Sequence, residues 1–379
     1  MTAMTEQFLP MVDQADLSAP ATLADIDAWV CAQEASTPFH RPMWIQAVER
    51  ATGQRAVMLV SRDAAGDIAG VLPLTIMKSM LFGKALVSSG FGIAGGILAD
   101  SDAVALTLAE AAWALANQLG CTTCELRGGP VPGDEWYSKD DVYLNFARPL
   151  AADDEAQLAS VPKRHRAEIR KGLANDLTFR TGRDSELRRI HYRLYCESVH
   201  RLGTPVFPKK LFDEIMDAFG EDADIGVAAH GDTPVSAVIS LYHRGACMPY
   251  WHGASVESRT LRSNEFLYFK MMGHARERGM SVFDFGRSKL GTGPAAWKKT
   301  WGFEGEPLAY AIRHAEGHAP RDVNPLSPKY QRKVEMWKKL PLPVANLIGP
   351  FLAKGLGLAR ARPGIDRKST RLNSSHTDI

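Results

Sequence analysis

The sequence predicts an α/β (α+β) fold in which one arrangement of strands and helices occurs twice. Three strands, a helix and a further strand follow one another between Val57 and Arg127, and the same order recurs between Ile225 and Phe285. The length of 379 residues is sufficient for two domains and a short third segment. A hydrophobic content of 45%, a charged content of 23% and a net charge of +2 are typical of a soluble globular protein and indicate no particular class of partner.

The first repeat begins with a hairpin. Ala64–Asp67 supplies the turn, and the apolar runs on both sides of it have the length and composition of strands. The helix that follows is rich in Ala and Leu, with Asp100, Ser101 and Asp102 as candidate N-cap residues and Gly120 as a C-cap. The repeat is predicted to contain strands at Val57–Val60, Ile68–Ile76, Ala85–Ser88 and Cys124–Arg127 and a helix at Ala103–Leu119.

The second repeat follows the same order with little identity of sequence. His230–Pro234 is the hairpin turn, and Gly279 ends the helix. We predict strands at Ile225–Ala229, Val235–Tyr242, Ala246–Trp251 and Val282–Phe285 and a helix at Asn264–Arg278. The expected division is a first domain at 1–150, a second at 151–330, a C-terminal extension at 331–367, and a polar, patternless tail at 368–379 that resembles a cloning or sequencing artefact.

The cysteines and the N-terminus favour a cytoplasmic protein. Five scattered cysteines do not form a disulfide framework, and Cys121 and Cys124, a lone C-x-x-C pair, are interpreted as core residues rather than metal ligands. We therefore expect no bound metal. Met1–Leu9 has an acidic residue and no basic or long apolar run, so it is not a secretory signal.

The segment around Phe283–Phe303 is the first candidate site. Val282–Phe285 reads as a strand, and Gly286 permits a turn or a close approach of the backbone to a ligand. Arg287, Ser288 and Lys289 then follow at the strand end, with further lysines near Trp297. This combination suits an anionic or phosphate-bearing substrate, and the alternative is a solvated basic loop.

Cations also gather in a predicted helix after the first domain. Lys163, Arg166 and Arg170 share one helical face and could hold a pyrophosphate or an RNA backbone, or could simply face solvent.

Aromatic and titratable residues mark the ends of two predicted strands. Tyr250 and Trp251 suit a substrate-lining wall or core packing. His252 is a candidate general base, because imidazole titrates near neutral pH. Asp284 is the other candidate, because a carboxylate between two Phe residues can have its pKa raised by burial, although a hydrogen-bonded strand residue is the simpler reading.

The chain resembles the FemAB-like transferases, in the branch found with exosortase and PEP-CTERM exopolysaccharide systems. The resemblance implies two GNAT-like domains, each with a mixed, mostly antiparallel sheet and flanking helices, and transfer of an acyl group to an amine. It implies that Lys298, next to Trp297, contacts the acyl donor or the developing negative charge, and that Thr204 lies in a rigid turn over the site. The motifs that carry it are His40–Trp44, Ala85–Gly92, Cys124–Gly129, Gly203–Pro208, Phe283–Phe303 and Asn324–Tyr330.

The resemblance also implies an acyl donor that is a co-substrate rather than a bound cofactor. GNAT enzymes usually hold the coenzyme A pyrophosphate on a glycine-containing turn before a helix, where backbone N–H groups face the phosphates. The corresponding segment, Ser258–Asn264, contains no glycine. Aminoacyl-tRNA, the donor of known FemAB-like enzymes, is therefore favoured over acyl-coenzyme A. Asn264 contacts the substrate or only caps the helix.

Three functions remain open on the sequence. The first is a FemAB-like N-acyltransferase of cell-envelope or exopolysaccharide synthesis, with an anionic or lipid-linked saccharide acceptor. The second is a coenzyme A-dependent N-acyltransferase acting on an amino sugar, and the third a non-catalytic GNAT-fold binding or scaffold protein. Leu340–Leu358, apolar with basic flanks, either anchors the protein peripherally at the inner membrane face or packs on the fold.

Overall fold

The computed structural model describes residues 11–79, 83–317 and 328–353, and these residues form two compact units. The first unit comprises Met1–Asp140 with Ala309–Ala319, and the second comprises Asp141–Leu308 with Pro320–Ile379. The predicted tail at 368–379 lies outside the described residues. Each unit contains a mixed sheet with helices on its faces, so the α/β class and the predicted repeat of a mixed sheet with flanking helices are confirmed.

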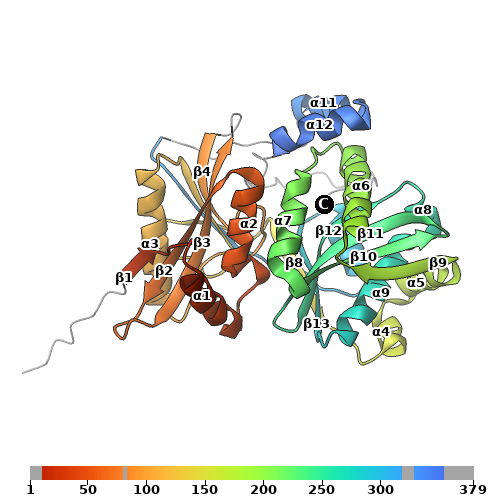
Figure 1. Cartoon of the computed structure of the whole chain (residues 1–379), viewed down its shortest axis with the longest axis horizontal. Coiled ribbons are helices and arrows are strands. Elements are labelled where there is room, and N and C mark those ends of the chain that lie inside the picture. Colours follow the sequence, from red (N-terminus) through yellow and green to blue (C-terminus); the bar gives the residue numbers. More distant parts are fainter. Residues whose placement is uncertain (1–10, 80–82, 318–327, 354–379) are drawn as a thin grey trace, which may run out of the picture. The chain divides into compact units, whose positions relative to one another are not determined.

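In the first unit the sheet order is β1-β2-β3-β4-β6-β15-β7, with β5 paired to β3. Helix α3 packs on one face, while α1 and α2 contact β2 and β3 from the other (Figure 1). The elements are β1 (Met11–Gln14), α1 (Pro20–Ala32), η1 (Pro38–His40), α2 (Pro42–Thr52), β2 (Arg55–Arg62), β3 (Ile68–Ser79), β4 (Gly83–Ser88), β5 (Leu98–Ala99), α3 (Asp102–Gln118), β6 (Thr123–Arg127), β7 (Tyr137–Lys139) and β15 (Tyr310–His314).

In the second unit the order is β14-β8-β13-β12-β11-β10-β9. Helix α9 contacts β9 to β11, and α6 contacts β10 to β12. The elements are β8 (Tyr143–Pro149), α4 (Asp154–Ser160), α5 (Lys163–Ala174), β9 (Leu177–Gly182), α6 (Ser185–Leu202), α7 (Lys209–Phe219), η2 (Gly220–Asp222), β10 (Ala223–His230), β11 (Thr233–His243), β12 (Ala246–Ala254), α8 (Ser258–Leu261), α9 (Ser263–Glu277), β13 (Val282–Lys289), α10 (Gly293–Thr300), β14 (Glu306–Pro307), α11 (Pro328–Lys338) and α12 (Leu342–Ala353).

Both sheets have the same internal order. Each contains one parallel pair, β4 with β6 and β12 with β13, joined in sequence by the long helix α3 or α9. An antiparallel strand lies next to each parallel pair, and in both cases it is distant in sequence from the strand that it pairs with. Strand β15 pairs with β6, and β8 pairs with β13. The unit formed by the N-terminal part of the chain is thus completed by a C-terminal strand.

The predicted elements of both repeats are present. The hairpin β2–β3 has its turn at the expected residues, and Ser101 caps α3 by accepting a hydrogen bond from the backbone N–H of Val104. The unit boundaries differ from the expected 1–150 and 151–330 division, because β8 pairs in the second sheet and β15 in the first. Residues 154–160, at the start of the expected second domain, form helix α4. Within the described ranges no helix is both long and apolar enough to cross a bilayer.

Candidate active site

The parallel strands β12 and β13 stay together for only a short distance. They pair at Ala246 with Val282 and at Cys247 with Phe283, whereas β12 continues to Ala254 and β13 to Lys289. A register shift in the β11–β12 ladder lies at the same level, between Ile239 and Ser240. Beyond the two pairs, β12 has no strand partner on this side among the described residues. An unpaired strand edge can bond an extended ligand chain through its N–H and C=O groups.

An aromatic cluster adjoins this divergence. Tyr268 of α9 lies 5.2 Å from Phe285 of β13 and 5.1 Å from Trp297 of α10, measured between ring centroids. Trp297 also directs its indole N–H toward Glu265, with 3.4 Å between the two heavy atoms. Trp301 packs on the same rings and is fully buried. Trp297, which is half-buried, is therefore the member of the cluster closest to solvent.

Lys298 points inward from α10 and is only 8% exposed. Its Nζ donates to the carbonyl oxygens of Phe285 at 2.7 Å, Gly286 at 3.0 Å and Arg287 at 3.1 Å. These carbonyls lie at an irregularity of β13, where the pairing with β8 shifts between Asp284 and Arg287. Burial lowers the pKa of the ammonium to about 7, although nearby Asp284 opposes the shift. Because an ammonium has three donors, contact with an acyl donor would require exchange of one of these bonds.

Asp284 lies beside the same irregularity. Its Oδ1 accepts hydrogen bonds from the backbone N–H of Gly286 at 2.7 Å and from Asn145 Nδ2 at 3.3 Å. Burial raises the pKa of this carboxyl to about 6, while the Gly286 bond and the charge of Lys298 act against the rise. A carboxyl with this pKa exists in both protonation states near neutral pH, as proton transfer requires.

His252 is held at the end of β12. Its Nε2 lies 3.1 Å from Oδ1 of Asn264, on the first turn of α9, and its ring stacks at 5.6 Å from Tyr268. Burial lowers the pKa of His252 to about 4, so the imidazole is neutral at physiological pH and a weaker base than Asp284. Tyr250 is half-buried, whereas Trp251 is buried against Phe212 of α7, with 4.8 Å between centroids.

The cations of α5 divide into two groups. Arg166 donates from Nη2 to the carbonyl oxygens of Ala159 at 2.6 Å and Val161 at 2.9 Å, so its guanidinium caps the end of α4. Lys163 and Arg170 are exposed. Helix α5 packs on the start of α9: a Cβ added at Gly172 would lie 2.8 Å from the carbonyl oxygen of Arg262. Glu168, Gly172 and Asn175 lie on the face of α5 that contacts the loop before α9, whereas the exposed Lys163 and Arg170 lie on the opposite face.

The loop before α9 contains the short helix α8, followed by Arg262 with a φ of 52°. Glu168 of α5 forms an ion pair with Arg262 at 2.5 Å, and Asn175 Nδ2 donates to the carbonyl oxygen of Leu261 at 2.7 Å. Left-handed backbone is uncommon for a residue with a side chain, and these bonds from α5 hold the segment in this conformation.

Arg287, Ser288 and Lys289 continue β13 beyond Asp284. The guanidinium of Arg287 lies over the ring of Tyr143 at 4.4 Å, Ser288 is buried, and Lys289 is half-buried at the end of the β13–β8 ladder. Thr204 is exposed in the loop after α6. The structure therefore brings Asp284, Lys298, Trp297, His252 and Asn264 together around β12, β13 and α9 and leaves Thr204 apart. Sequence reasoning missed Tyr268 and Asn145, which have no motif and are recognised only from their partners.

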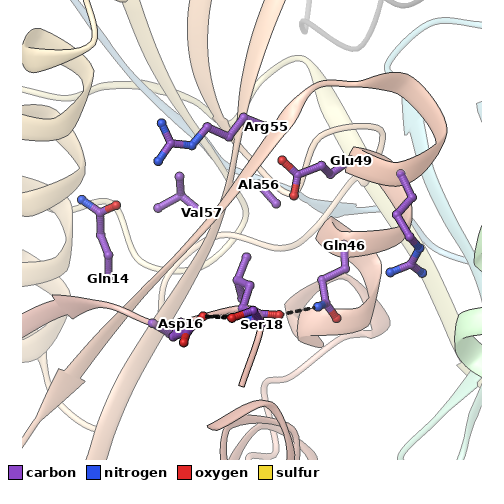
Figure 2. Close-up of a pocket in the computed structure, with 11 residues that line it drawn as sticks. Gln14, Asp16, Ser18, Gln46, Glu49, Arg55, Ala56 and Val57 are labelled. Atoms are coloured by element: carbon purple, nitrogen blue, oxygen red, sulfur yellow. Dashed lines mark hydrogen bonds between the residues drawn. The ribbon is translucent and has the colours of Figure 1, made fainter. Parts of the chain in front are cut away.

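A pocket of about 430 Å³ lies in the first unit, away from all of these residues. It is lined by the loop after β1, by α2 and by the start of β2 (Figure 2). Asp16 Oδ1 accepts hydrogen bonds from Ser18, and Gln46 Nε2 donates to the carbonyl oxygen of Leu17. Its lining includes two carboxylates, Asp16 and Glu49, and two guanidinium groups, Arg50 and Arg55, and none of the predicted site residues. In the described part of the chain no group of three or more His, Cys, Asp or Glu residues could hold a metal ion.

Comparisons with known proteins agree with this location. Residues 159–299 match the model of the GNAT acetyltransferase domain, which covers α5 to α10. FemX is similar in structure, with 15% identity, a TM-score of 0.61 and coverage of 79% of this chain and 96% of that one. A tandem GNAT protein of the clavulanic acid biosynthesis pathway has 13% identity, a TM-score of 0.52 and coverage of 82% and 100%.

A third similar structure is the C-terminal domain assigned to a lysylphosphatidylglycerol synthetase of Agrobacterium fabrum, with 14% identity, a TM-score of 0.52 and coverage of 77% and 92%. No curated protein matches the chain. At these identities the solved structures establish the fold, and the domain match supports acyltransferase activity. The chain thus carries an acyltransferase domain of the GNAT type in its second unit.

Three buried histidines predict how stability depends on pH. Burial lowers the pKa values of His165, His191 and His252 to about 4, from 6.5 in the unfolded chain. Between pH 6.5 and 4 the unfolded chain binds more protons, so the free energy of unfolding falls on acidification. Asp284 acts in the opposite direction between pH 3.8 and 6, but it is one group against three.

We therefore expect Tm to fall between pH 6.5 and 4.5 in thermal scans, and to fall less steeply in His252→Gln, which removes one of the three groups. An unchanged Tm over this range, or an NMR titration of His252 near pH 6.5, would contradict the assignment.

Proposed function

We propose that the protein is an N-acyltransferase that moves an aminoacyl or related acyl group onto an amine, in cell-envelope or exopolysaccharide biosynthesis. The observation that carries the proposal is the early separation of β12 from β13 inside the matched GNAT domain. Beyond Cys247, β12 pairs with no strand on this side among the described residues, and this edge suits an extended donor chain. The reacting carbonyl would lie near the strand ends, beside Asp284 and the aromatic cluster.

The proposed chemistry is direct attack by the acceptor amine on the donor carbonyl. A C–N bond forms, the bond between the acyl carbon and the donor's ester oxygen breaks, and the proton that the amine loses ends on that leaving oxygen. Asp284, with its pKa of about 6, would accept the proton that the amine loses. Lys298 would act on the developing negative charge, either through an N–H group released from a carbonyl or by fixing the Phe285–Arg287 backbone. His252 and Asn264 would orient the substrate as a neutral hydrogen-bonded pair, with Trp297 and Tyr250 as its walls.

Aminoacyl-tRNA is the donor we favour. The loop between Ser255 and Asn264 contains α8 and Arg262 in place of a glycine turn, so it does not offer the backbone cradle that holds a pyrophosphate. The exposed Lys163 and Arg170 of α5 supply charge for a nucleic acid backbone. Arg287, Ser288 and Lys289 would contact the anionic part of a lipid-linked saccharide acceptor, and Thr204 would border its entry. The protein would then work at the inner membrane face from the cytoplasm.

A coenzyme A-dependent N-acyltransferase is the second candidate. The observation in its favour is the domain match itself, since the matched family is that of GNAT acetyltransferases. A non-catalytic GNAT-fold scaffold is a third candidate, favoured by the complete engagement of Lys298 with backbone carbonyls.

Isothermal titration calorimetry separates the donors. We expect no saturable binding of acetyl-coenzyme A at physiological concentration, because the pyrophosphate cradle is missing. A charged tRNA mixture should bind, with an affinity that falls as salt increases. Lys163→Glu/Arg170→Glu should weaken tRNA binding, whereas Arg180→Glu, an exposed residue of β9 paired with Glu186, serves as the control. A one-to-one binding isotherm with acetyl-coenzyme A would support the second candidate instead. If an activity assay detects no acyl transfer from either donor, the third candidate is favoured.

A further inference from the structure

Helix α12 presents two different apolar faces. Ala345, Gly349 and Ala353, spaced four residues apart, are buried. A Cβ added at Gly349 would meet Val206 Cγ1 at 2.8 Å, so this face lies close against the loop after α6. His200 Nε2, in the last turn of α6, lies 2.9 Å from the carbonyl oxygen of Leu340, at the start of the segment. The small side chains thus seat α12 on the second unit, next to α11 and α6 (Figure 1).

The other face of α12 carries large apolar side chains that remain exposed. Leu347 is 70% exposed and Phe351 is 73% exposed. The exposed positions follow one another at intervals of three, one, three and one residues, which places them on a single stripe of a helix. We call them the exposed stripe: Val344, Leu347, Ile348, Phe351 and Leu352. Contiguous exposed apolar surface of this kind marks an interaction site.

The sequence around the exposed stripe is uniformly basic. Between Met336 and Ile365 there is no Asp or Glu. The same segment carries five cations, of which Lys338 ends α11 and pairs with Glu335 at 3.2 Å: Lys338, Lys339, Lys354, Arg360 and Arg362. An apolar stripe with cations at both ends has the pattern of a helix that lies in the interface of an anionic bilayer.

We propose that the exposed stripe docks on an anionic lipid surface, with α12 lying in the plane of the interface. A second copy of the chain is a poorer occupant, because two such faces would bring like charges together. The stripe is also small: twelve helical residues span about 18 Å, and with a helix diameter of about 10 Å they offer a projected area of about 180 Å². A stable protein interface buries roughly 800 Å² per partner. A bilayer supplies anionic headgroups at the cations and acyl chains at Leu347 and Phe351.

Docking through α12 would also fix the distance between β12 and the lipid surface. Helix α6, which carries α11 and α12 at one end, packs along β12: a Cβ added at Gly253 would lie 2.3 Å from the backbone nitrogen of Tyr195. Docking would therefore hold β12 at a fixed height above the lipid surface, where a lipid-linked acceptor presents its saccharide. Only this consequence rests on the proposed function, because binding to lipid can be measured without turnover.

Vesicle flotation of the full chain tests the proposal. We expect the protein to float with vesicles of phosphatidylcholine and phosphatidylglycerol, and to do so less as salt increases but still measurably at high salt. Leu347→Glu/Phe351→Glu should lower the partition coefficient on the order of tenfold or more, because it removes the apolar contribution. Lys338→Ala/Lys339→Ala should lower it about tenfold at low salt and little at high salt.

The control is Leu106→Glu/Tyr137→Glu, which changes two exposed apolar residues of the first unit and should float as the unchanged protein does. All variants should keep the Tm of the unchanged protein, since the replaced side chains are exposed. Absence of flotation overturns the proposal. So does flotation that Leu347→Glu/Phe351→Glu does not reduce. If the unchanged protein does not float, and light scattering shows that it is a dimer whereas Leu347→Glu/Phe351→Glu is a monomer, the stripe is instead a self-association surface. If the unchanged protein floats with vesicles but transfers no acyl group, only the proposed function is refuted.

Discussion

Replacing Lys298 with Met should destabilise the second unit and abolish most of its activity. Met keeps the length of the side chain but leaves the carbonyls of Phe285, Gly286 and Arg287 buried without their donor. Unsatisfied buried groups destabilise by about 1–3 kcal/mol each, whereas removal of a buried ammonium is favourable, so we expect a net loss of about 2–4 kcal/mol in denaturant unfolding. Loss of one electrostatic contact to the reacting group typically lowers the rate by about 10²–10³.

The neighbouring Lys299→Met is the matched control, because Lys299 lies on the same helix and is exposed. It should leave both stability and transfer unchanged. The pair of measurements also separates the two roles proposed for Lys298. If Lys298→Met keeps its stability and loses transfer, the ammonium acts on the substrate. If it loses stability and transfers normally when folded, the ammonium only supports the irregularity of β13.

Replacing Gly253 with Ala should disrupt the packing of β12 on α6. The added Cβ would lie 2.3 Å from the nitrogen of Tyr195 and 2.5 Å from the carbonyl carbon of Leu194. Both are backbone atoms in a helix, so relief requires movement of a whole element rather than of a side-chain tip. We expect a loss on the order of 3 kcal/mol or more in unfolding free energy, with a corresponding loss of activity.

Gly273→Ala is the control for this change. Gly273 lies in α9, where a Cβ would meet only the side-chain ends of Asp154, which is exposed, at 3.2 Å and of Arg276, which is half-buried, at 3.6 Å. Alanine is favoured over glycine inside a helix by roughly 0.5–1 kcal/mol, so this variant should be as stable as the unchanged protein or slightly more so. A Gly253→Ala protein with normal Tm would show that β12 and α6 can separate, and that the close approach is not required.

The local elements were predictable because their signals are local. The hairpin turn at Ala64–Asp67 and the cap at Ser101 depend on residues near in sequence, and both are found where expected. The exchange of β8 and β15 was not predictable. Either strand would fit beside either parallel pair by its own apolar pattern, and the choice depends on contacts between distant parts of the chain.

The sequence predicted which residues belong to the candidate site better than it predicted the contacts that these residues make. The sequence identified Asp284 and its environment, and burial indeed raises its pKa. It also placed Arg166 on the face of α5 with Lys163, as the helix confirms. It could not show that Arg166 turns back to cap α4, because that bond depends on where α4 ends. Charge in a sequence indicates capacity for binding, and only packing decides which charges are already used.

The crossing of β15 into the first sheet has a consequence for how the protein is made. Tyr310 of β15 pairs with Arg127 of β6, so the first sheet keeps an open edge until nearly the whole second unit has left the ribosome. Domains usually fold in order during synthesis, and unpaired edges are prone to association meanwhile. We therefore expect a nascent chain stalled before residue 309 to remain protease-sensitive in its N-terminal half. That half should become resistant to protease when Tyr310–His314 emerges from the ribosome. The two units would then complete their folding at nearly the same time.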